Sequence, residues 1–220
     1  MEMNQHIELS VLDPDTTVAN IQTNCDAAMQ YHFAAVCVPP LFVKKAKEIL
    51  KNSPVKVATV IGFPFGYSAV EAKIAETVLA IIDAVDELNV VINISAIKNN
   101  DWQYLANEIN HILPIVNSNN KILKINIEAG LLTDDEIIKC CDLYGIAGVH
   151  FIETATGFAS SAPSLHQIQL IRKHLADAIQ IKAGAGLINY TFAMQLIAAG
   201  VNRIGTTNGI RILEEMNQLN

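Results

Sequence analysis

The stretch Phe-Ile-Glu-Thr-Ala-Thr-Gly, residues 151–157, has the apolar composition of a buried strand that runs into a glycine turn, yet it carries Glu153. A second such stretch, Ile-Gln-Ile-Lys-Ala-Gly-Ala-Gly at 179–186, carries Lys182 in the same setting. Desolvating an isolated charge is costly, so a buried charge is tolerated when it is paired or used. The two strands therefore predict a single site that contains a carboxylate and an ammonium group.

Short runs rich in Val, Ile and Ala alternate along the whole chain with amphipathic stretches of helical period. The expected strands lie at 7–12, 34–38, 55–61, 87–93, 123–129, 149–154, 179–183 and 202–206. The expected helices lie at 16–31, 41–50, 69–85, 101–116, 134–144, 164–175 and 190–199. Capping boxes are predicted at Ser68–Glu71, Thr133–Glu136 and Ser164–Gln167, and helix stops at Gly145 and Gly200.

Eight strands that are apolar enough for burial on both faces predict a parallel sheet covered by helices, an α/β fold. Eight is also the number that closes a (β/α)₈ TIM barrel, and we expect one such domain over residues 1–220. The alternative is an open doubly wound sheet, which usually shows a glycine fingerprint after its first strand. Here Asp-Pro-Asp-Thr-Thr follows at 13–17, so the barrel is preferred.

Composition excludes several classes of function. The chain has 220 residues, 51% of them hydrophobic, and a net charge of −7, which argues against disorder and against a nucleic-acid partner. No apolar run approaches the roughly 18 residues of a membrane span. Four cysteines without C-x-x-C spacing indicate a reduced, cytoplasmic protein, and six scattered histidines give no metal-ligand pattern. We therefore expect neither metal nor cofactor.

Polar residues inside the expected strands locate the site, because alternate residues of a strand share one face. Each one alone is as consistent with a hydrogen-bonded core residue. Five strands that contribute polar groups to one face are harder to explain in that way. The residues are Glu8, Asn89, Lys124, Glu153 and Lys182.

Small residues follow the seventh and eighth expected strands, where this fold commonly binds phosphate at a helix N-terminus. The sequences are Gly-Ala-Gly at 184–186 and Gly-Thr-Thr-Asn-Gly at 205–209. Either loop alone is weak evidence, but their order in the chain favours a phosphate site. The candidate phosphate-binding residues are Ala185, Gly186, Thr207 and Asn208.

Four motifs resemble the deoxyribose-phosphate aldolase family. They are Ala-Ala-Val-Cys-Val-Pro-Pro at 34–40, Ala-Thr-Val-Ile-Gly-Phe-Pro at 58–64, Asp-Glu-Leu-Asn-Val-Val-Ile-Asn-Ile at 86–94 and Gly-Val-Asn-Arg-Ile-Gly-Thr at 200–206. The resemblance implies a (β/α)₈ barrel that cleaves 2-deoxyribose 5-phosphate to glyceraldehyde 3-phosphate and acetaldehyde. It also implies a lysine Schiff base without metal, and a small phosphorylated sugar or aldehyde as partner.

The resemblance fails at the residues that carry the chemistry. Glu153 stands where the family has its Schiff-base lysine, Asn89 where it has the proton-shuttling aspartate, and Glu8 where it has a further aspartate. The phosphate loop reads Gly-Ala-Gly where the family has a Gly-Gly pair. The positions that match are Cys37, Lys124, Glu128, Thr156 and Lys182, and Gly157 joins the phosphate candidates.

These departures have chemical consequences. A glutamate cannot form an imine, and beside Lys182 it favours the charged ammonium, which is a poor nucleophile. Asn89 cannot supply the carboxylate expected of a general base. Both of the groups that the family reaction needs most are therefore replaced.

Three hypotheses remain open. The chain is an aldolase relative with an impaired or lost reaction that keeps a phosphorylated-ligand pocket, which would make it a pseudoenzyme. Alternatively, it is an active carbon–carbon lyase in which Lys182 forms the imine and Glu153 is its acid/base partner. The third is a non-catalytic binding or assembly protein. Self-association into a homo-oligomer is left open.

Overall fold

The computed structural model describes residues 2–158, 164–184 and 188–219. Eight parallel strands pair in sequence order, and the first pairs with the last, so the sheet closes into a barrel. The predicted (β/α)₈ barrel is confirmed. The strands are β1 (Ile7–Ser10), β2 (Ala35–Val38), β3 (Lys56–Ile61), β4 (Glu87–Val91), β5 (Ile122–Asn126), β6 (Phe151–Glu153), β7 (Gln180–Ala183) and β8 (Arg203–Thr206).

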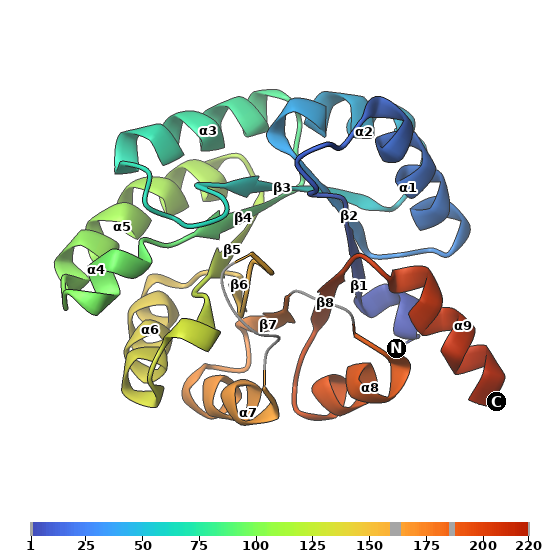
Figure 1. The fold of residues 1–220 in the computed structure, drawn as a ribbon. Coiled ribbons are helices and arrows are strands. Elements are labelled where there is room, and N and C mark those ends of the chain that lie inside the picture. Colours follow the sequence, from blue (N-terminus) through green and yellow to red (C-terminus); the bar gives the residue numbers. More distant parts are fainter. Residues whose placement is uncertain (1, 159–163, 185–187, 220) are drawn as a thin grey trace.

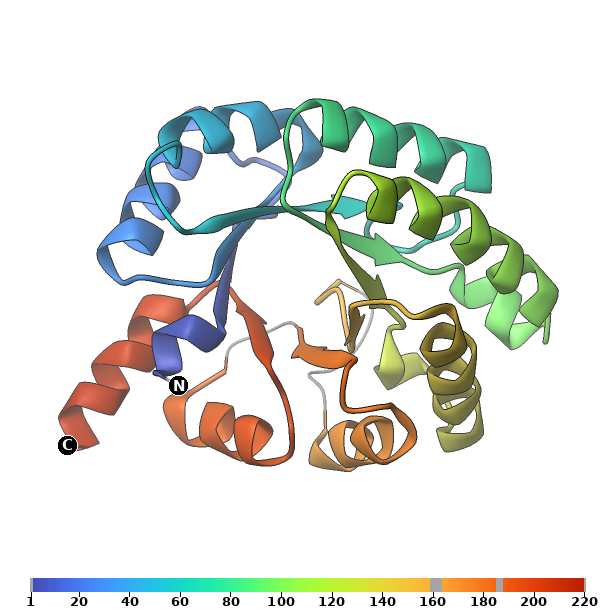
Figure 2. The ribbon, with the colours of Figure 1, turned by 180° about the vertical axis from the view of Figure 1, so that it is seen from behind.

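The helices form an outer ring around the strands, as Figures 1 and 2 show from opposite sides. They are α1 (Val18–Gln30), α2 (Val43–Ile49), α3 (Val70–Ile82), α4 (Ile94–Lys98), α5 (Trp102–Ser118), α6 (Asp134–Ala147), α7 (Leu165–His174), α8 (Tyr190–Ala198) and α9 (Gly209–Leu219). The described residues also form three short 3₁₀ turns, η1 (Met3–His6), η2 (Pro40–Phe42) and η3 (Ala129–Leu131). None of the described helices combines the length and apolar content that a membrane span needs.

Alternation along the strands divides the protein into two cores. In β4, Leu88 and Val90 face outward and join the large apolar cluster beneath the helices. Glu87 and Asn89 alternate with them and face the barrel axis, where both are buried. Burial of apolar side chains stabilises the outer layer, by about 1.5–3 kcal/mol for each large one. The interior layer combines a small apolar cluster of Cys37, Ala58 and Val60 with buried charged residues, and these charges single it out as the place for function.

Local signals place some element ends as predicted. Thr133 and Ser164 form complete capping boxes with Glu136 and Gln167 at the starts of α6 and α7. Gly200, with a φ of 103°, follows α8 as expected. The capping box at Ser68 is wrong, because α3 begins after Ala69 without a side-chain cap.

Other boundaries also differ from the sequence prediction. Gly145 lies within α6, which ends instead at Gly148, whose φ of 76° suits a glycine. The fourth strand ends early because Asn93 accepts a hydrogen bond from the backbone of Ala96 and caps α4. The fifth ends early because Glu128 takes a left-handed conformation. Helices α4 and α9 were not predicted.

Candidate active site

The barrel interior gathers charged side chains from six strands. In register, Glu153 of β6 pairs with Lys182 of β7, and Asn89 of β4 pairs with Lys124 of β5. Strands in register present equivalent residues to the same face, so these side chains converge on the axis. Glu8 reaches them from β1. All five polar residues predicted from the strands therefore lie in one buried cluster.

Glu8 is the centre of this cluster. Its Oε2 accepts from Lys124 Nζ at 2.5 Å, and its Oε1 accepts from Lys182 Nζ at 2.6 Å and from Asn89 Nδ2 at 3.0 Å. Burial by itself raises the pKa of the Glu8 carboxyl, but Lys124, Lys182 and Arg203 outweigh burial and hold that pKa well below its usual range. Glu8 is therefore an anion at neutral pH that holds two lysines in place.

Lys182 lies between two carboxylates. Its Nζ is 2.6 Å from Glu8 Oε1 and 2.8 Å from Glu153 Oε1. Burial lowers the pKa of the ammonium group, but the charges of Glu153 and Glu8 more than offset burial and raise that pKa above the ordinary lysine value. Lys182 is consequently an ammonium ion at neutral pH.

Glu153 differs from Glu8 in having one unused oxygen. Its Oε1 meets Lys182, whereas its Oε2 is buried and has no hydrogen-bond partner within the described residues. Burial raises the pKa of the Glu153 carboxyl, and the attraction of Lys182 offsets only part of this effect. Asn89 likewise keeps a buried Oδ1 without a partner in the described ranges. Buried polar atoms of this kind call for a functional explanation.

Two members of the cluster were missed by sequence reasoning. Glu87 Oε2 lies 2.5 Å from Lys124 Nζ and 3.2 Å from Arg203 Nη1, and Arg203 also approaches Glu8 at 3.4 Å. A signal for Glu87 existed, because it lies two residues before Asn89 on the same strand face. These contacts close the deeper half of the cluster and leave the pair of Glu153 and Lys182 at its other edge.

Cys37 and Thr156 contribute less directly. Cys37 Sγ accepts a hydrogen bond from Asn89 Nδ2 at 3.3 Å, and burial, followed by the negative charge of Glu8, raises the pKa of its thiol. Thr156 donates from its backbone N at 2.9 Å and from its Oγ1 at 2.7 Å to Glu128 Oε2. That contact joins the loops after β5 and β6 at the rim of the barrel.

The predicted phosphate-binding residues have varied surroundings. Gly157 follows Thr156 with a φ of 85°. Asn208 donates from its Nδ2 to the carbonyl of Ile188 at 2.9 Å, so its amide tethers the segment that precedes α8. Thr207 lines a cavity of about 290 Å³ together with Asp13 and Asp15, whose charges disfavour an anion.

Two of the candidates, Ala185 and Gly186, lie outside the described residues.

A cavity of about 20 Å³ opens from the cluster, which is room for about one water molecule. Ligand binding must therefore displace side chains, and the half-buried residues that line this cavity in the described part of the chain are Ser10, Leu12 and Phe63. Glycines at 184 and 205 provide space for the charged pair. A Cβ on Gly184 would lie 2.9 Å from Glu153 Oε1, and one on Gly205 would lie 2.8 Å from Lys182 Cε.

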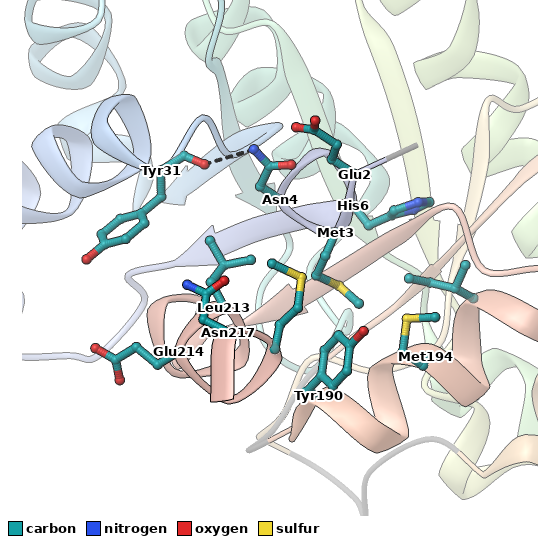
Figure 3. Close-up of a pocket in the computed structure, with 12 residues that line it drawn as sticks. Glu2, Met3, Asn4, His6, Tyr31, Tyr190, Met194, Leu213, Glu214 and Asn217 are labelled. Atoms are coloured by element: carbon teal, nitrogen blue, oxygen red, sulfur yellow. Dashed lines mark hydrogen bonds between the residues drawn. The ribbon is translucent and has the colours of Figure 1, made fainter. Parts of the chain in front are cut away.

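A larger cavity of about 730 Å³ lies elsewhere, between η1, α8 and α9 (Figure 3). Met3, Tyr190, Met194 and Leu213 are among its lining residues, and none of the charged interior residues reaches it. Within the described residues, no group of three or more His, Cys, Asp or Glu side chains could hold a metal ion. The barrel interior is therefore the candidate active site.

Fold and site together define a (β/α)₈ barrel protein with a buried carboxylate–ammonium centre inside the strands. The chain is 42% identical to the deoxyribose-phosphate aldolase of Caldicellulosiruptor saccharolyticus, over 97% of this chain and 98% of that relative. It is 40% identical to that of Thermococcus kodakarensis, over 97% of this chain and 96% of the relative. No protein-family model matches it. The chain belongs to the deoxyribose-phosphate aldolase family.

Solved structures agree with this assignment. The aldolase QR15 superimposes with a TM-score of 0.93 at 32% identity, covering 99% of this chain and 97% of that one. The deoxyribose phosphate aldolase from Aeropyrum pernix, described as a tetramer, gives 0.91 at 24% identity, covering 99% and 92%. The second likeness concerns the fold alone.

Proposed function

We propose that this protein binds a small phosphorylated sugar or aldehyde in the barrel and does not form the Schiff base of its family. The family reaction, cleavage of 2-deoxyribose 5-phosphate, is then impaired or replaced. The supporting observation is the position of Lys182, whose ammonium group lies 2.6 Å from one carboxylate and 2.8 Å from another. An amine must be neutral to attack a carbonyl, and both contacts favour its charged form.

The remaining groups agree with this proposal. Glu153 occupies the Schiff-base position and has no amine, and Asn89 is an amide where a general base is needed. Lys124 is held by Glu8 and Glu87, each at 2.5 Å, in the deeper half of the cluster. Every lysine in the barrel interior of the described chain is thus paired with carboxylates.

The second candidate is a lyase in which Lys182 forms the imine and Glu153 shuttles protons. The raised pKa of the Glu153 carboxyl and its unpartnered Oε2 favour that role for the acid. The raised pKa of Lys182 opposes the role of nucleophile. The third candidate is a non-catalytic binding or assembly protein, and a role in assembly alone would leave both unpartnered oxygens unexplained.

Reduction with borohydride separates these candidates. The protein is incubated with 2-deoxyribose 5-phosphate or acetaldehyde, reduced and digested, and the mass of the peptide that contains Lys182 is measured. We expect no added mass, because no imine forms. An adduct at Lys182 would overturn the proposal in favour of the lyase.

A gain-of-function variant tests the same proposal from the other side. Glu153→Lys combined with Asn89→Asp restores both family groups, and we expect measurable cleavage of 2-deoxyribose 5-phosphate. Glu153→Lys alone is the matched control and should gain less, because it lacks the general base. An inactive double variant that still binds the sugar phosphate would argue against an aldolase-type pocket.

The domain organisation, the cellular location and the phosphate site are also part of what we propose. We infer that the chain works as one domain, in the cytoplasm, and that phosphate binds near the loops after β7 and β8.

Self-association is supported by exposed apolar side chains on α3, where Leu79 is 62% and Ile82 is 71% exposed. Sedimentation analysis of the wild type and of Leu79→Glu tests self-association.

A further inference from the structure

The edge of the cluster that faces the small cavity is unfinished. Glu153 Oε2 is buried without a hydrogen-bond partner in the described part of the chain, and Asn89 Oδ1 is in the same state. An ammonium group has three N–H donors, and the described contacts of Lys182 use two of them, on Glu8 and Glu153. All three residues line the same cavity. The site therefore presents a free carboxylate oxygen beside a cationic donor.

This combination suits the removal of a proton from a carbon next to a carbonyl group. Such chemistry needs a base whose pKa is closer to neutrality than that of an ordinary carboxyl, together with a donor that stabilises the oxyanion as it forms. A cation in a site that excludes water stabilises such an anion more strongly than it would in water. Glu153 and Lys182 satisfy both needs without covalent attachment.

We propose that Glu153 and Lys182 catalyse non-covalent proton exchange at the carbon adjacent to the carbonyl of a short phosphorylated aldehyde or sugar. This inference rests on the proposed function, because it requires a substrate that is bound without an imine. It assigns the pair of Glu153 and Lys182 a catalytic role that does not involve the imine of the family reaction.

Glu153 Oε2 takes the proton from the carbon next to the carbonyl, and the electron pair of the broken C–H bond forms a carbon–carbon double bond. The π electrons of the carbonyl move to its oxygen, which accepts the third N–H of Lys182. The proton on Glu153 exchanges with solvent, and its return to carbon restores the aldehyde.

Glu8 explains why Lys182 remains charged throughout. When Glu153 is protonated its negative charge disappears, but Glu8 still accepts from Lys182 at 2.6 Å. The ammonium therefore keeps one anionic partner at the moment when the oxyanion forms. With Glu153 as its one carboxylate, the buried ammonium would have no anionic partner whenever Glu153 is protonated and no oxyanion is present, which is costly.

Deuterium uptake tests the inference. The protein is incubated in D₂O with 2-deoxyribose 5-phosphate, and the C2 protons of the sugar are followed by NMR. We expect loss of the C2 proton signal well above the rate in buffer, and about a 10²-fold or greater reduction in Glu153→Gln. The matched control is Glu71→Gln, the same chemical change at an exposed position, which should exchange like the wild type.

The pH dependence gives a second readout that needs no variant. The base must be ionised, and the pKa of Glu153 is raised by burial, so the rate should rise with pH through a value above that of an ordinary carboxyl and then level off. A rate that is independent of pH across that range would contradict the role of Glu153.

Combined with borohydride reduction, the outcomes separate this inference from the proposed function. Deuterium uptake without an adduct, lost in Glu153→Gln, supports both. Absence of both uptake and adduct, with the sugar phosphate bound, overturns the inference and leaves the proposed function standing. An adduct at Lys182 overturns the proposed function and, with it, the non-covalent step. Uptake at the wild-type rate in folded Glu153→Gln overturns the inference alone.

Discussion

Two buried lysines of this protein lie at the same distance from a glutamate and differ in character. Lys73 of α3 meets Glu108 of α5 at 2.6 Å between the helices, and Lys182 meets Glu8 at 2.6 Å inside the barrel. Burial lowers the pKa of Lys73 despite the attraction of Glu108. The pKa of Lys182 is raised, because Glu153 adds a second negative charge that more than offsets burial. Within the described residues Lys182 contacts two carboxylates directly and Lys73 contacts one, and this difference accounts for the opposite directions of the two pKa shifts.

The two sites also differ in their hydrogen bonding and in whether they border a cavity. Lys73 donates to the backbone carbonyl of Val91 at 2.7 Å as well as to Glu108, so the pair ties α3 to β4 and α5. No cavity among those described contains either residue. The barrel site borders a cavity and keeps unpartnered oxygens on Glu153 and Asn89. These differences agree with a structural role for the first site and with the ligand site that we propose for the second.

The largest loss of stability is expected for Glu8→Gln. The amide removes the anion that Lys124, Lys182 and Arg203 share, and breaking a buried ion pair costs about 3–5 kcal/mol of folding free energy. We expect a loss toward the upper end of that range, measured by urea unfolding. Glu2→Gln, at an exposed position, is the control and should change stability by less than about 0.5 kcal/mol. Equal losses in the two variants would disprove the central role of Glu8.

Lys73→Met should cost about 3 kcal/mol, because it leaves Glu108 buried without its partner. The double variant Lys73→Met with Glu108→Leu should recover most of this loss, since an apolar pair avoids the desolvation cost. Thermal unfolding of both variants checks the comparison. A double variant as unstable as the single one would mean that the pair has a role beyond mutual neutralisation.

Lowering the pH should reduce the difference in free energy of unfolding between the wild type and Glu8→Gln. The pKa of Glu8 in the folded protein lies below its unfolded value, so its stabilising contribution is complete above the ordinary glutamate pKa and is lost as pH falls through the lowered folded value. Urea unfolding at pH 7 and at successively lower pH measures the gap, which should narrow. A gap that stays constant would show that Glu8 is not held ionised by its cations.

The smallest loss of stability is expected for an ion pair at the surface. Lys98 Nζ lies 2.6 Å from Glu136, the same distance as in the buried pairs, but the Lys98 side chain is 42% exposed. Water and salt weaken such a pair, so Lys98→Met should cost less than about 1 kcal/mol. The variant keeps the Thr133 cap intact and isolates the ion pair. A loss as large as that of Lys73→Met would remove burial as the explanation of the difference.

The sequence predicted the barrel because eight runs that are apolar enough for burial on both faces alternate with amphipathic helical stretches. It predicted the charged centre for the same reason, since Glu153 and Lys182 break an apolar pattern. It did not reveal Arg203 as a member, because an arginine at the start of a strand is equally expected at the rim.

Other features depend on tertiary neighbours. Lys73 is a charged residue within the amphipathic pattern of α3, and its partners, Val91 and Glu108, come from other elements of the fold. The surroundings of Thr207 depend on how the loop with Asp13 and Asp15 meets the loop after β8, which local sequence does not fix. Contacts between loops thus limit prediction more than the pattern within strands does.

The net charge of the barrel interior depends on the order in which lysine at 153 and aspartate at 89 are restored. Within the described residues the cluster holds three carboxylates and three cations, Glu8, Glu87, Glu153, Lys124, Lys182 and Arg203. If Glu153→Lys came first, the enclosed charge would change from zero to +2, since an anion is lost and a cation gained. If Asn89→Asp came first, the successive states would carry −1 and then +1. With the new lysine charged, placing the aspartate before the lysine keeps the enclosed charge closer to zero at the intermediate step.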